Sequence, residues 1–289
     1  MSTITPPAPF RFKGTTLDFT TPRIMGVLNA TPDSFHGDSR VMQAKKAAQR
    51  AVQMVAAGAD LLDIGGQSSR PGATPLSAGE ELARVLPVIE EIRNALPDCP
   101  LSIDTYQAEV ARQAIAAGCD IINDIGAGRL DPEMEDLMAD LNVPCILMHM
   151  QGTPETMQDR PQYEHPTDEV LAFLTERLET LRAKGAEQLA VDPGFGFGKT
   201  LAHNFQLLDH FARFAELGVP VLAGVSRKSM IYKTLSSVPE RALNGTSVLH
   251  AWALERGAHI LRVHDVAEAK ECVKLHGALI QHRTSLRHD

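Results

Sequence analysis

Residues suited to binding an anion follow an apolar run near residue 60. The segment Asp63–Gly72, DIGGQSSRPG, combines an acid, paired glycines, two hydroxyls, an arginine and a proline. Ser68, Ser69 and Arg70 could hold a phosphate through charge-assisted hydrogen bonds, and Pro71 would keep the loop in place. An ordinary surface loop needs no such mixture, so we interpret this segment as an anion-binding loop.

Further cations follow two later apolar runs. Lys228 comes shortly after the run at 221–225, and Arg262 closes the last run of the chain with His264 beside it. Barrel enzymes commonly bind phosphate near their last strands, so Arg262 and His264 predict a second phosphate contact. The alternative is that the arginines only pair with Asp or Glu on the rim.

A second set of side chains is suited to a flat heterocycle. The polar members are Asp104, Asn123, Asp192 and Lys228, and the apolar wall is Met148 and Phe197. An ionised carboxylate accepts two parallel N–H bonds from an amidine-like edge, and a lysine donates to a carbonyl or ring nitrogen. The alternative is a buried ion network that only stabilises the protein, although buried carboxylates are costly without a partner.

These residues follow short apolar runs that alternate with amphipathic helical patterns. The expected strands are 24–28, 61–64, 101–103, 121–122, 145–148, 189–191, 221–225 and 260–263. Strands that are apolar throughout and separated by helices indicate a parallel sheet. Each run ends in polar residues, and these meet at one mouth only if the sheet closes. We therefore predict a single-domain (β/α)8 TIM barrel rather than a doubly wound sheet.

We expect the barrel to span residues 23–280. Residues 1–22 would form an N-terminal extension with a hairpin under the barrel, and 281–289 a C-terminal tail. Irregular loops are expected at 30–40, 66–77 and 151–165, because polar and turn-forming residues replace the periodic patterns there.

Composition argues against several other classes of function. A net charge of −8 disfavours binding to nucleic acid or anionic membranes. The four cysteines and eleven histidines form no metal or redox motif, and the glycine spacing of PGFGFGKT at 193–200 fits neither ATP nor NAD binding. Those glycines would instead turn tightly beside a ligand. With no signal-peptide pattern and no apolar run near the roughly 20 residues of a membrane span, we expect a cytoplasmic protein.

From about residue 23 to residue 276 the chain resembles the dihydropteroate synthases of folate biosynthesis. The matching segments, in family order, are IMGVLNATPDSF, DIGGQSSRPGA, SIDTYQAEVA, IINDI, LMHMQGTPETMQ, VDPGFGFGKTLAHN, GVSRKSMI and RVHDV. Eight segments in register are very specific. The first loop departs from the family pattern, because its usual acid is absent at Gly37, where only the neighbouring Asp38 offers a substitute. Gln67 and Ser69 stand where Glu and Thr are usual.

The resemblance implies a role for each candidate residue. The pterin ring would meet Asp104, Asn123, Met148, Asp192, Phe197, Gly224 and Lys228. The pyrophosphate would meet Ser69, Arg70, Arg262 and His264, and Asn29 would help to place Mg2+. The p-aminobenzoate would meet Phe35, Pro71, Phe197, Lys228 and Ser229, its carboxylate near the start of a helix. Asp104, Lys228, Arg70 and Arg262 would be the catalytic groups.

The resemblance also implies the reaction, in which 6-hydroxymethyl-7,8-dihydropterin pyrophosphate and p-aminobenzoate give 7,8-dihydropteroate and pyrophosphate. We expect a largely dissociative displacement, in which Mg2+ and the cations stabilise the leaving group. Sulfonamides are expected to inhibit, since the Phe-Gly insertion of some resistant relatives is not evident. A homodimer through the late helices is expected. The alternatives are a pterin-binding domain of a methyl-transfer system and an inactive paralogue.

Overall fold

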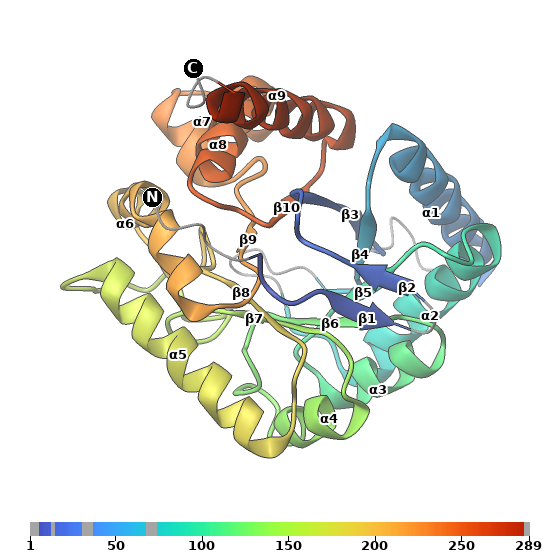
Figure 1. The fold of residues 1–289 in the computed structure, drawn as a ribbon. Coiled ribbons are helices and arrows are strands. Elements are labelled where there is room, and N and C mark those ends of the chain that lie inside the picture. The colour runs from blue at the N-terminus through green and yellow to red at the C-terminus, as the bar shows by residue number, and fades with distance from the viewer. Residues whose placement is uncertain (1–5, 13–14, 31–36, 68–73, 286–289) are drawn as a thin grey trace.

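The computed structural model describes residues 6–12, 15–30, 37–67 and 74–285. The strands of the larger sheet are β3 (Arg23–Asn29), β4 (Leu61–Gly65), β5 (Leu101–Asp104), β6 (Ile121–Asp124), β7 (Cys145–Met148), β8 (Leu189–Asp192), β9 (Leu222–Ala223) and β10 (Ile260–Val263). Within the described ranges, these eight strands are parallel and ordered β8-β7-β6-β5-β4-β3-β10-β9. A parallel bridge between Val191 and Val221 joins the two edges. The predicted (β/α)8 barrel is confirmed (Figure 1).

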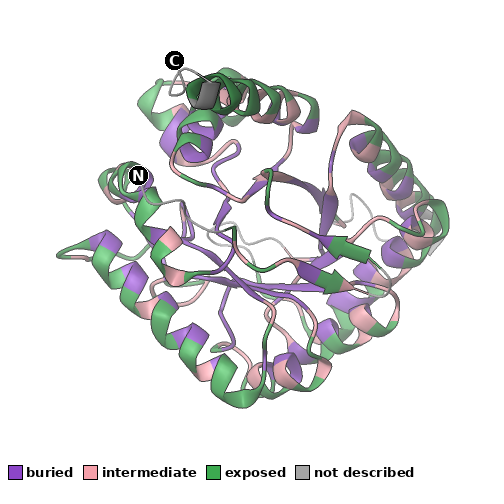
Figure 2. Cartoon of the chain, in the orientation of Figure 1, coloured by how far each residue is buried: buried purple, intermediate pink, exposed green. Residues whose placement is uncertain are grey.

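Helices surround the barrel and bury one face each against it (Figure 2). They are α1 (Gly37–Ala57), α2 (Ala78–Ala95), α3 (Ala108–Ala116), α4 (Met134–Leu141), α5 (Pro166–Lys184), α6 (Leu201–Asp209), α7 (Ser229–Thr234), α8 (Leu243–Glu255) and α9 (Val266–Ser285), with 3-10 turns η1 (Phe211–Leu217) and η2 (Pro239–Arg241). Gly185 ends α5 in the left-handed region, at φ 108°, where a side chain would be strained. Along the described ranges, no helix is long and apolar enough to cross a membrane.

A short hairpin packs on the amino-terminal end of the barrel. Strands β1 (Phe10–Phe12) and β2 (Thr15–Leu17) pair antiparallel. The side chains of Phe10, Leu17 and Phe19 are buried in one cluster with the inward-facing residues of the first barrel layer. Those residues are Met25, Leu61, Ile121, Ile146, Ala190, Leu222 and Ile260. The amino-terminal end is therefore filled with apolar side chains, which leaves the opposite end for a ligand.

Strand alternation determines which side chains reach that opposite end. In β4, Leu61 belongs to the cluster inside the barrel, whereas Leu62 packs in the cluster beneath the helices. Side chains two residues apart share a face of a strand, so Asp63 and Gly65 follow Leu61 into the interior. The same parity turns Asp104, Asn123, Asp192 and Arg262 inward at the carboxyl ends of their strands.

One expected loop boundary was wrong. We expected residues 30–40 to form an irregular loop, but α1 already begins at Gly37, so residues 37–40 are helical. The helical pattern that we recognised began only at Ala44, because the polar residues before it hide the first turns. Residues 31–36 lie outside the described part of the chain. Residues 151–165 contain no helix or strand, as expected.

Candidate active site

A cavity of about 680 Å3, the central cavity, opens at the carboxyl ends of the barrel strands. The predicted site residues that line it are Asn29, Asp104, Asn123, Met148, Asp192, Phe197, Gly224, Lys228, Ser229, Arg262 and His264. These residues lie at or after the ends of seven different strands and meet because the sheet closes. Phe35, Ser69, Arg70 and Pro71 were also predicted to lie here, but they fall outside the described residues.

Arg262 does not stand free in the cavity. Its Nε donates to Asp63 Oδ2 at 2.6 Å and a terminal nitrogen donates to Asp104 Oδ2 at 2.6 Å. The sequence left two possibilities for Arg262, a phosphate contact and pairing with carboxylates, and the structure shows the pairing. Burial acts to lower the pKa of Arg262, but Asp63 and Asp104 outweigh it and raise the pKa.

Asp63 is a residue that our site prediction missed. Its side chain is completely buried and lies behind the lining of the central cavity. Besides Arg262, its Oδ2 accepts a hydrogen bond from Asn123 Nδ2 at 3.0 Å. The available signal was an acid in the middle of the apolar run at 61–65, at an inward-facing position. We placed that acid in the expected strand 61–64 but did not include it among the site residues.

The two carboxylates that line the central cavity are each held on one oxygen. Asp192 Oδ1 accepts a hydrogen bond from the backbone N–H of Gly194 at 2.7 Å, and Asp104 Oδ2 pairs with Arg262. Burial raises the pKa of both Asp104 and Asp192, although Arg262 and Lys228 oppose the rise. A ligand that donates N–H groups to the other oxygens would favour the ionised forms of both acids.

Lys228 supplies a cation on the opposite wall. Its Nζ lies 4.2 Å from the centre of the Phe197 ring, which holds the ammonium by a cation–π contact. Burial and the nearby Arg262 lower the pKa of Lys228 to about 8, against the attraction of Asp192 and Asp104. Lys228 therefore remains protonated at neutral pH and can donate hydrogen bonds into the cavity.

His264 is a polar neighbour rather than a third cation. Its Nδ1 lies 3.0 Å from Ser226 Oγ, which also accepts a hydrogen bond from the His264 backbone N–H. Burial and the charge of Arg262 lower the pKa of His264 to about 4. His264 therefore acts as a hydrogen-bonding imidazole beside Arg262 at neutral pH.

Lys199 is buried behind the segment that carries Phe197. Its Nζ lies 2.9 Å from His149 Nδ1 and donates to the carbonyl oxygens of Gly194 and Phe197 at 3.0 and 2.9 Å. Burial lowers the pKa of Lys199 to about 7. Burial, followed by the charge of Lys199, lowers the pKa of His149 to about 2. His149 is therefore a neutral hydrogen-bonding residue here.

The glycines of residues 193–198 form tight turns, as expected, with positive φ at Gly194, Gly196 and Gly198. A β-carbon on Gly194 would lie 2.0 Å from the carbonyl oxygen of His149, and one on Gly198 would lie 2.8 Å from that of Gln151. These two glycines therefore also allow close approach to the protein's own backbone. The packed segment presents Phe197 and Gly196 to the central cavity.

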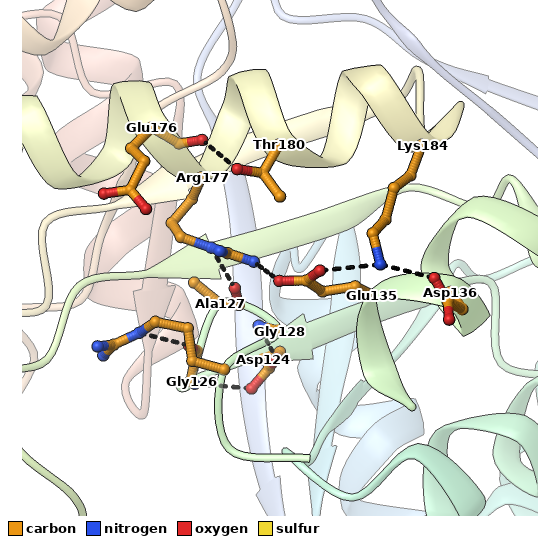
Figure 3. A network of polar contacts seen from close by, with 11 residues as sticks. Asp124, Gly126, Ala127, Gly128, Glu135, Asp136, Glu176, Arg177, Thr180 and Lys184 are labelled. Carbon is orange, nitrogen blue, oxygen red and sulfur yellow. Dashed lines mark hydrogen bonds and ion pairs between the residues drawn. The ribbon is translucent and has the colours of Figure 1, made fainter. Parts of the chain in front are cut away.

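A polar network fixes the turn after β6, whose Ile125 lines the central cavity (Figure 3). The two oxygens of the buried Asp124 accept hydrogen bonds from the backbone N–H groups of Gly126 and Gly128, both at 2.6 Å. Arg177 of α5 donates to the carbonyl oxygen of Ala127 at 2.9 Å. Its guanidinium also pairs with Glu135, which Lys184 contacts at 3.0 Å.

Not every polar residue at a strand end reaches the mouth. Asp124 and His149 are engaged in the contacts above, and Arg227 forms a two-pronged ion pair with Asp265, with both distances 2.8 Å. None of the three lines the central cavity. Conversely, the cavity is lined by Lys233, which we did not predict. The available signal was its position four residues after Ser229, on the same face of a helix.

Among the described residues, Asn29 is an oxygen donor that could hold a metal at the rim. Asn29 is exposed at the end of β3 and carries an amide oxygen, a hard donor suited to Mg2+. Across the described ranges, no three His, Cys, Asp or Glu side chains are grouped to hold a metal ion by themselves. Mg2+ commonly takes one or two protein ligands and completes its shell with substrate phosphates and waters. Asn29 fits that second arrangement.

A larger hollow of about 960 Å3 lies beside α5 and α6, around Tyr163, Asp168 and His203. It shares no lining residue with the central cavity. The charged and apolar groups predicted to bind a heterocycle are all in the central cavity, so we assign the site there.

Comparison with known proteins finds relatives that match most of the chain. The family described as pterin binding enzyme matches residues 25–264. Dihydropteroate synthase of Haemophilus influenzae is 44% identical over 261 residues, which cover 90% of this chain and 94% of that protein. The structure of Xanthomonas albilineans dihydropteroate synthase with 4-aminobenzoic acid has a TM-score of 0.87 at 44% identity, over 95% of this chain and 98% of that one. A Yersinia pestis dihydropteroate synthase with a sulfonamide drug has a TM-score of 0.89 at 40% identity, over 95% and 100%.

The buried Lys199 predicts a pH-dependent stability. The pKa of Lys199 is about 7 in the folded protein and near its ordinary value of 10.5 when unfolded. Between these pH values the unfolded state binds more protons, so stability should rise with pH. The free energy of unfolding of the native protein, relative to Lys199→Met, should rise by up to about 1.4 kcal/mol per pH unit. Urea unfolding of both proteins from pH 7 to 10 measures this, and a constant difference would contradict it.

Proposed function

The chain belongs to the dihydropteroate synthases within the pterin binding enzyme family, and from this membership we propose how its central cavity carries out the reaction. The reaction joins 6-hydroxymethyl-7,8-dihydropterin pyrophosphate to p-aminobenzoate and releases pyrophosphate. One observation carries the proposal. A single cavity, walled by Met148 and Phe197, brings together four polar side chains from separate strand ends: the carboxylates of Asp104 and Asp192, the amide of Asn123 and the ammonium of Lys228. Each carboxylate already uses one oxygen in a contact with the protein.

The pterin ring is held by complementary hydrogen bonds. The N–H groups of its pyrimidine edge donate to Asp192 and Asp104, and Lys228 donates to its carbonyl or a ring nitrogen. Phe197 and Met148 pack on the ring, and Gly224 leaves room for it because it carries no side chain. Asp104 and Asp192 then face the positive charge that develops on the ring as the C–O bond breaks.

Pyrophosphate leaves toward the rim of the barrel. The family roles of Ser69 and Arg70 place them around the pyrophosphate, together with Arg262 and the neutral His264. Asn29 would hold Mg2+ with the substrate phosphates, and the ion would neutralise charge on the leaving group. The electron pair of the C–O bond leaves with pyrophosphate, so preorganised positive charge at this rim lowers the barrier.

The arylamine attacks from the remaining side. Phe35, Pro71, Phe197, Lys228 and Ser229 surround p-aminobenzoate in this proposal, with its carboxylate near Ser229 at the start of α7. The amine is neutral at pH 7, and its nitrogen lone pair forms the new C–N bond while one N–H proton is lost to solvent. This chemistry needs no strong general base, which agrees with a cavity built from binding groups.

The direct test combines the purified protein, the pterin pyrophosphate, p-aminobenzoate and Mg2+. We expect release of pyrophosphate and formation of 7,8-dihydropteroate, each requiring both substrates. Sulfamethoxazole should compete with p-aminobenzoate, since a sulfonamide occupies the Yersinia pestis relative. A pterin that binds without any product would identify a binding protein and overturn the proposal.

Lys228 predicts how pterin affinity depends on pH. Its pKa is about 8, so its ammonium group is lost as the pH rises through that value, and with it the hydrogen bond to the ring. The dissociation constant of the pterin pyrophosphate should therefore increase above pH 8 in the native protein. In Lys228→Met, binding should be weaker throughout, without this alkaline increase. Fluorescence titration from pH 6.5 to 9.5 measures both, and an identical alkaline increase would exclude Lys228 as its source.

We also propose a homodimer, located in the cytoplasm. Exposed apolar side chains gather on the late helices, with Trp252 on α8 and Leu275, Leu279 and Ile280 on α9. Leu275 is 73% exposed, although burying it would be favourable. Light scattering should give twice the mass of the chain, and Leu275→Glu should shift the protein toward the monomer. The exposed Glu179→Lys on α5, outside the late helices, is the control, and a native monomer would refute the dimer.

A further inference from the structure

We propose that Asp63 is a positioning residue that holds two pterin-binding side chains in place from behind the central cavity. This inference rests on the proposed function, because it concerns how the pterin ring is recognised. Asp63 does not line the cavity, and its side chain is completely buried. It would act on the substrate only through its neighbours.

A single oxygen atom of Asp63 makes both contacts. Asp63 Oδ2 accepts a hydrogen bond from Asn123 Nδ2 at 3.0 Å and another from Arg262 Nε at 2.6 Å. The other side of the Arg262 guanidinium pairs with Asp104 at 2.6 Å. Asp63 is thus linked directly to two residues that line the cavity, and through Arg262 to a third.

These contacts restrict the directions in which the cavity can offer hydrogen bonds. With its nitrogen directed to Asp63, the amide of Asn123 has a defined orientation toward the ligand. The guanidinium is planar, so carboxylates on two of its nitrogens fix its plane as well. A rigid set of donors and acceptors loses less conformational entropy when a flat ring binds. Asp63 would therefore increase affinity for the pterin without touching it.

The energetic cost of Asp63 points to function rather than to stability alone. Its second oxygen, Oδ1, is buried and has no hydrogen-bond partner among the described residues. A buried carboxylate that is only half satisfied costs folding free energy, and an apolar residue in its place is often neutral or stabilising. A barrel selected only for stability has no need of an acid in its inner layer.

Asp120 provides a matched control on the same barrel. Its carboxylate also pairs with an arginine, Arg93, at 2.8 Å and accepts a second hydrogen bond, from Leu101 N, at 2.9 Å. Asp120 lies just before β6 begins, at the amino-terminal end of the barrel and away from the central cavity. Asp63→Asn and Asp120→Asn each remove one arginine-paired carboxylate, but only the first removes one that contacts cavity residues.

The experiment measures binding of the pterin pyrophosphate without p-aminobenzoate, and then the KM of each substrate. We expect Asp63→Asn to weaken pterin binding by about tenfold or more, the size expected when a charged hydrogen bond is lost. The KM of p-aminobenzoate should change by less than about twofold, and Asp120→Asn should retain native pterin affinity. Asp63→Ser is the second variant, because its shorter side chain cannot clash with the residues around Asp63. Thermal unfolding with and without the pterin pyrophosphate measures binding as a shift in Tm, even in a variant whose stability is lower.

Two results would overturn the inference. One is native pterin affinity in both Asp63 variants, and the other is an equal loss in Asp120→Asn, which would indicate a general effect of stability. Failure of the proposed function looks different, because the native protein itself would then release no pyrophosphate from the two substrates.

Discussion

The ion pairing of Arg262 is the interaction on which the central cavity depends. This side chain starts on β10 and reaches carboxylates on β4 and β5, so it passes over β3 and links strands that are not neighbours. Asp63 and Asp104 would each be costly to bury alone, and so would the guanidinium. Together they allow three charged groups to lie at the centre of a barrel whose opposite end is filled with apolar side chains.

Most of the fold could be predicted from the sequence because a parallel barrel leaves a strong pattern. Strands covered on both sides must be apolar throughout, and the polar residue that ends each run marks the mouth. All eight strands were located, although β9 (Leu222–Ala223) is shorter than its apolar run. The start of α1 was missed because its first residues, from Gly37, carry no apolar periodicity. Position along the chain was therefore easier to predict than the exact end of each element.

The site was harder to predict than the fold, because the spacing of residues within a segment does not show which side chains pair across the barrel interior. Asp63 and Arg262 are 199 positions apart, and nothing in either segment identifies the other as its partner. In the same way, Arg227 follows the apolar run at 221–225 but pairs with Asp265 instead of lining the central cavity, and burial beside Arg262 lowers the pKa of His264. Residue types told us which chemistry was possible, whereas protonation and orientation followed only from three-dimensional neighbours.

The two acids that line the central cavity, Asp104 and Asp192, retain hydrogen-bonding capacity that a ligand can use. One oxygen of Asp104 pairs with Arg262, and one oxygen of Asp192 accepts a hydrogen bond from the Gly194 N–H. Burial nevertheless raises the pKa of both carboxyl groups. Each of these acids keeps its other oxygen, and each oxygen has two lone pairs, so the carboxylates can still accept parallel N–H bonds from a ring edge, as first expected. A neutral ring with several N–H donors would supply hydrogen bonds to these acids without adding charge. Lys228 and Asn123 line the same cavity and can hydrogen-bond to the acceptor atoms of such a ring, so one cavity offers partners for both its donors and its acceptors.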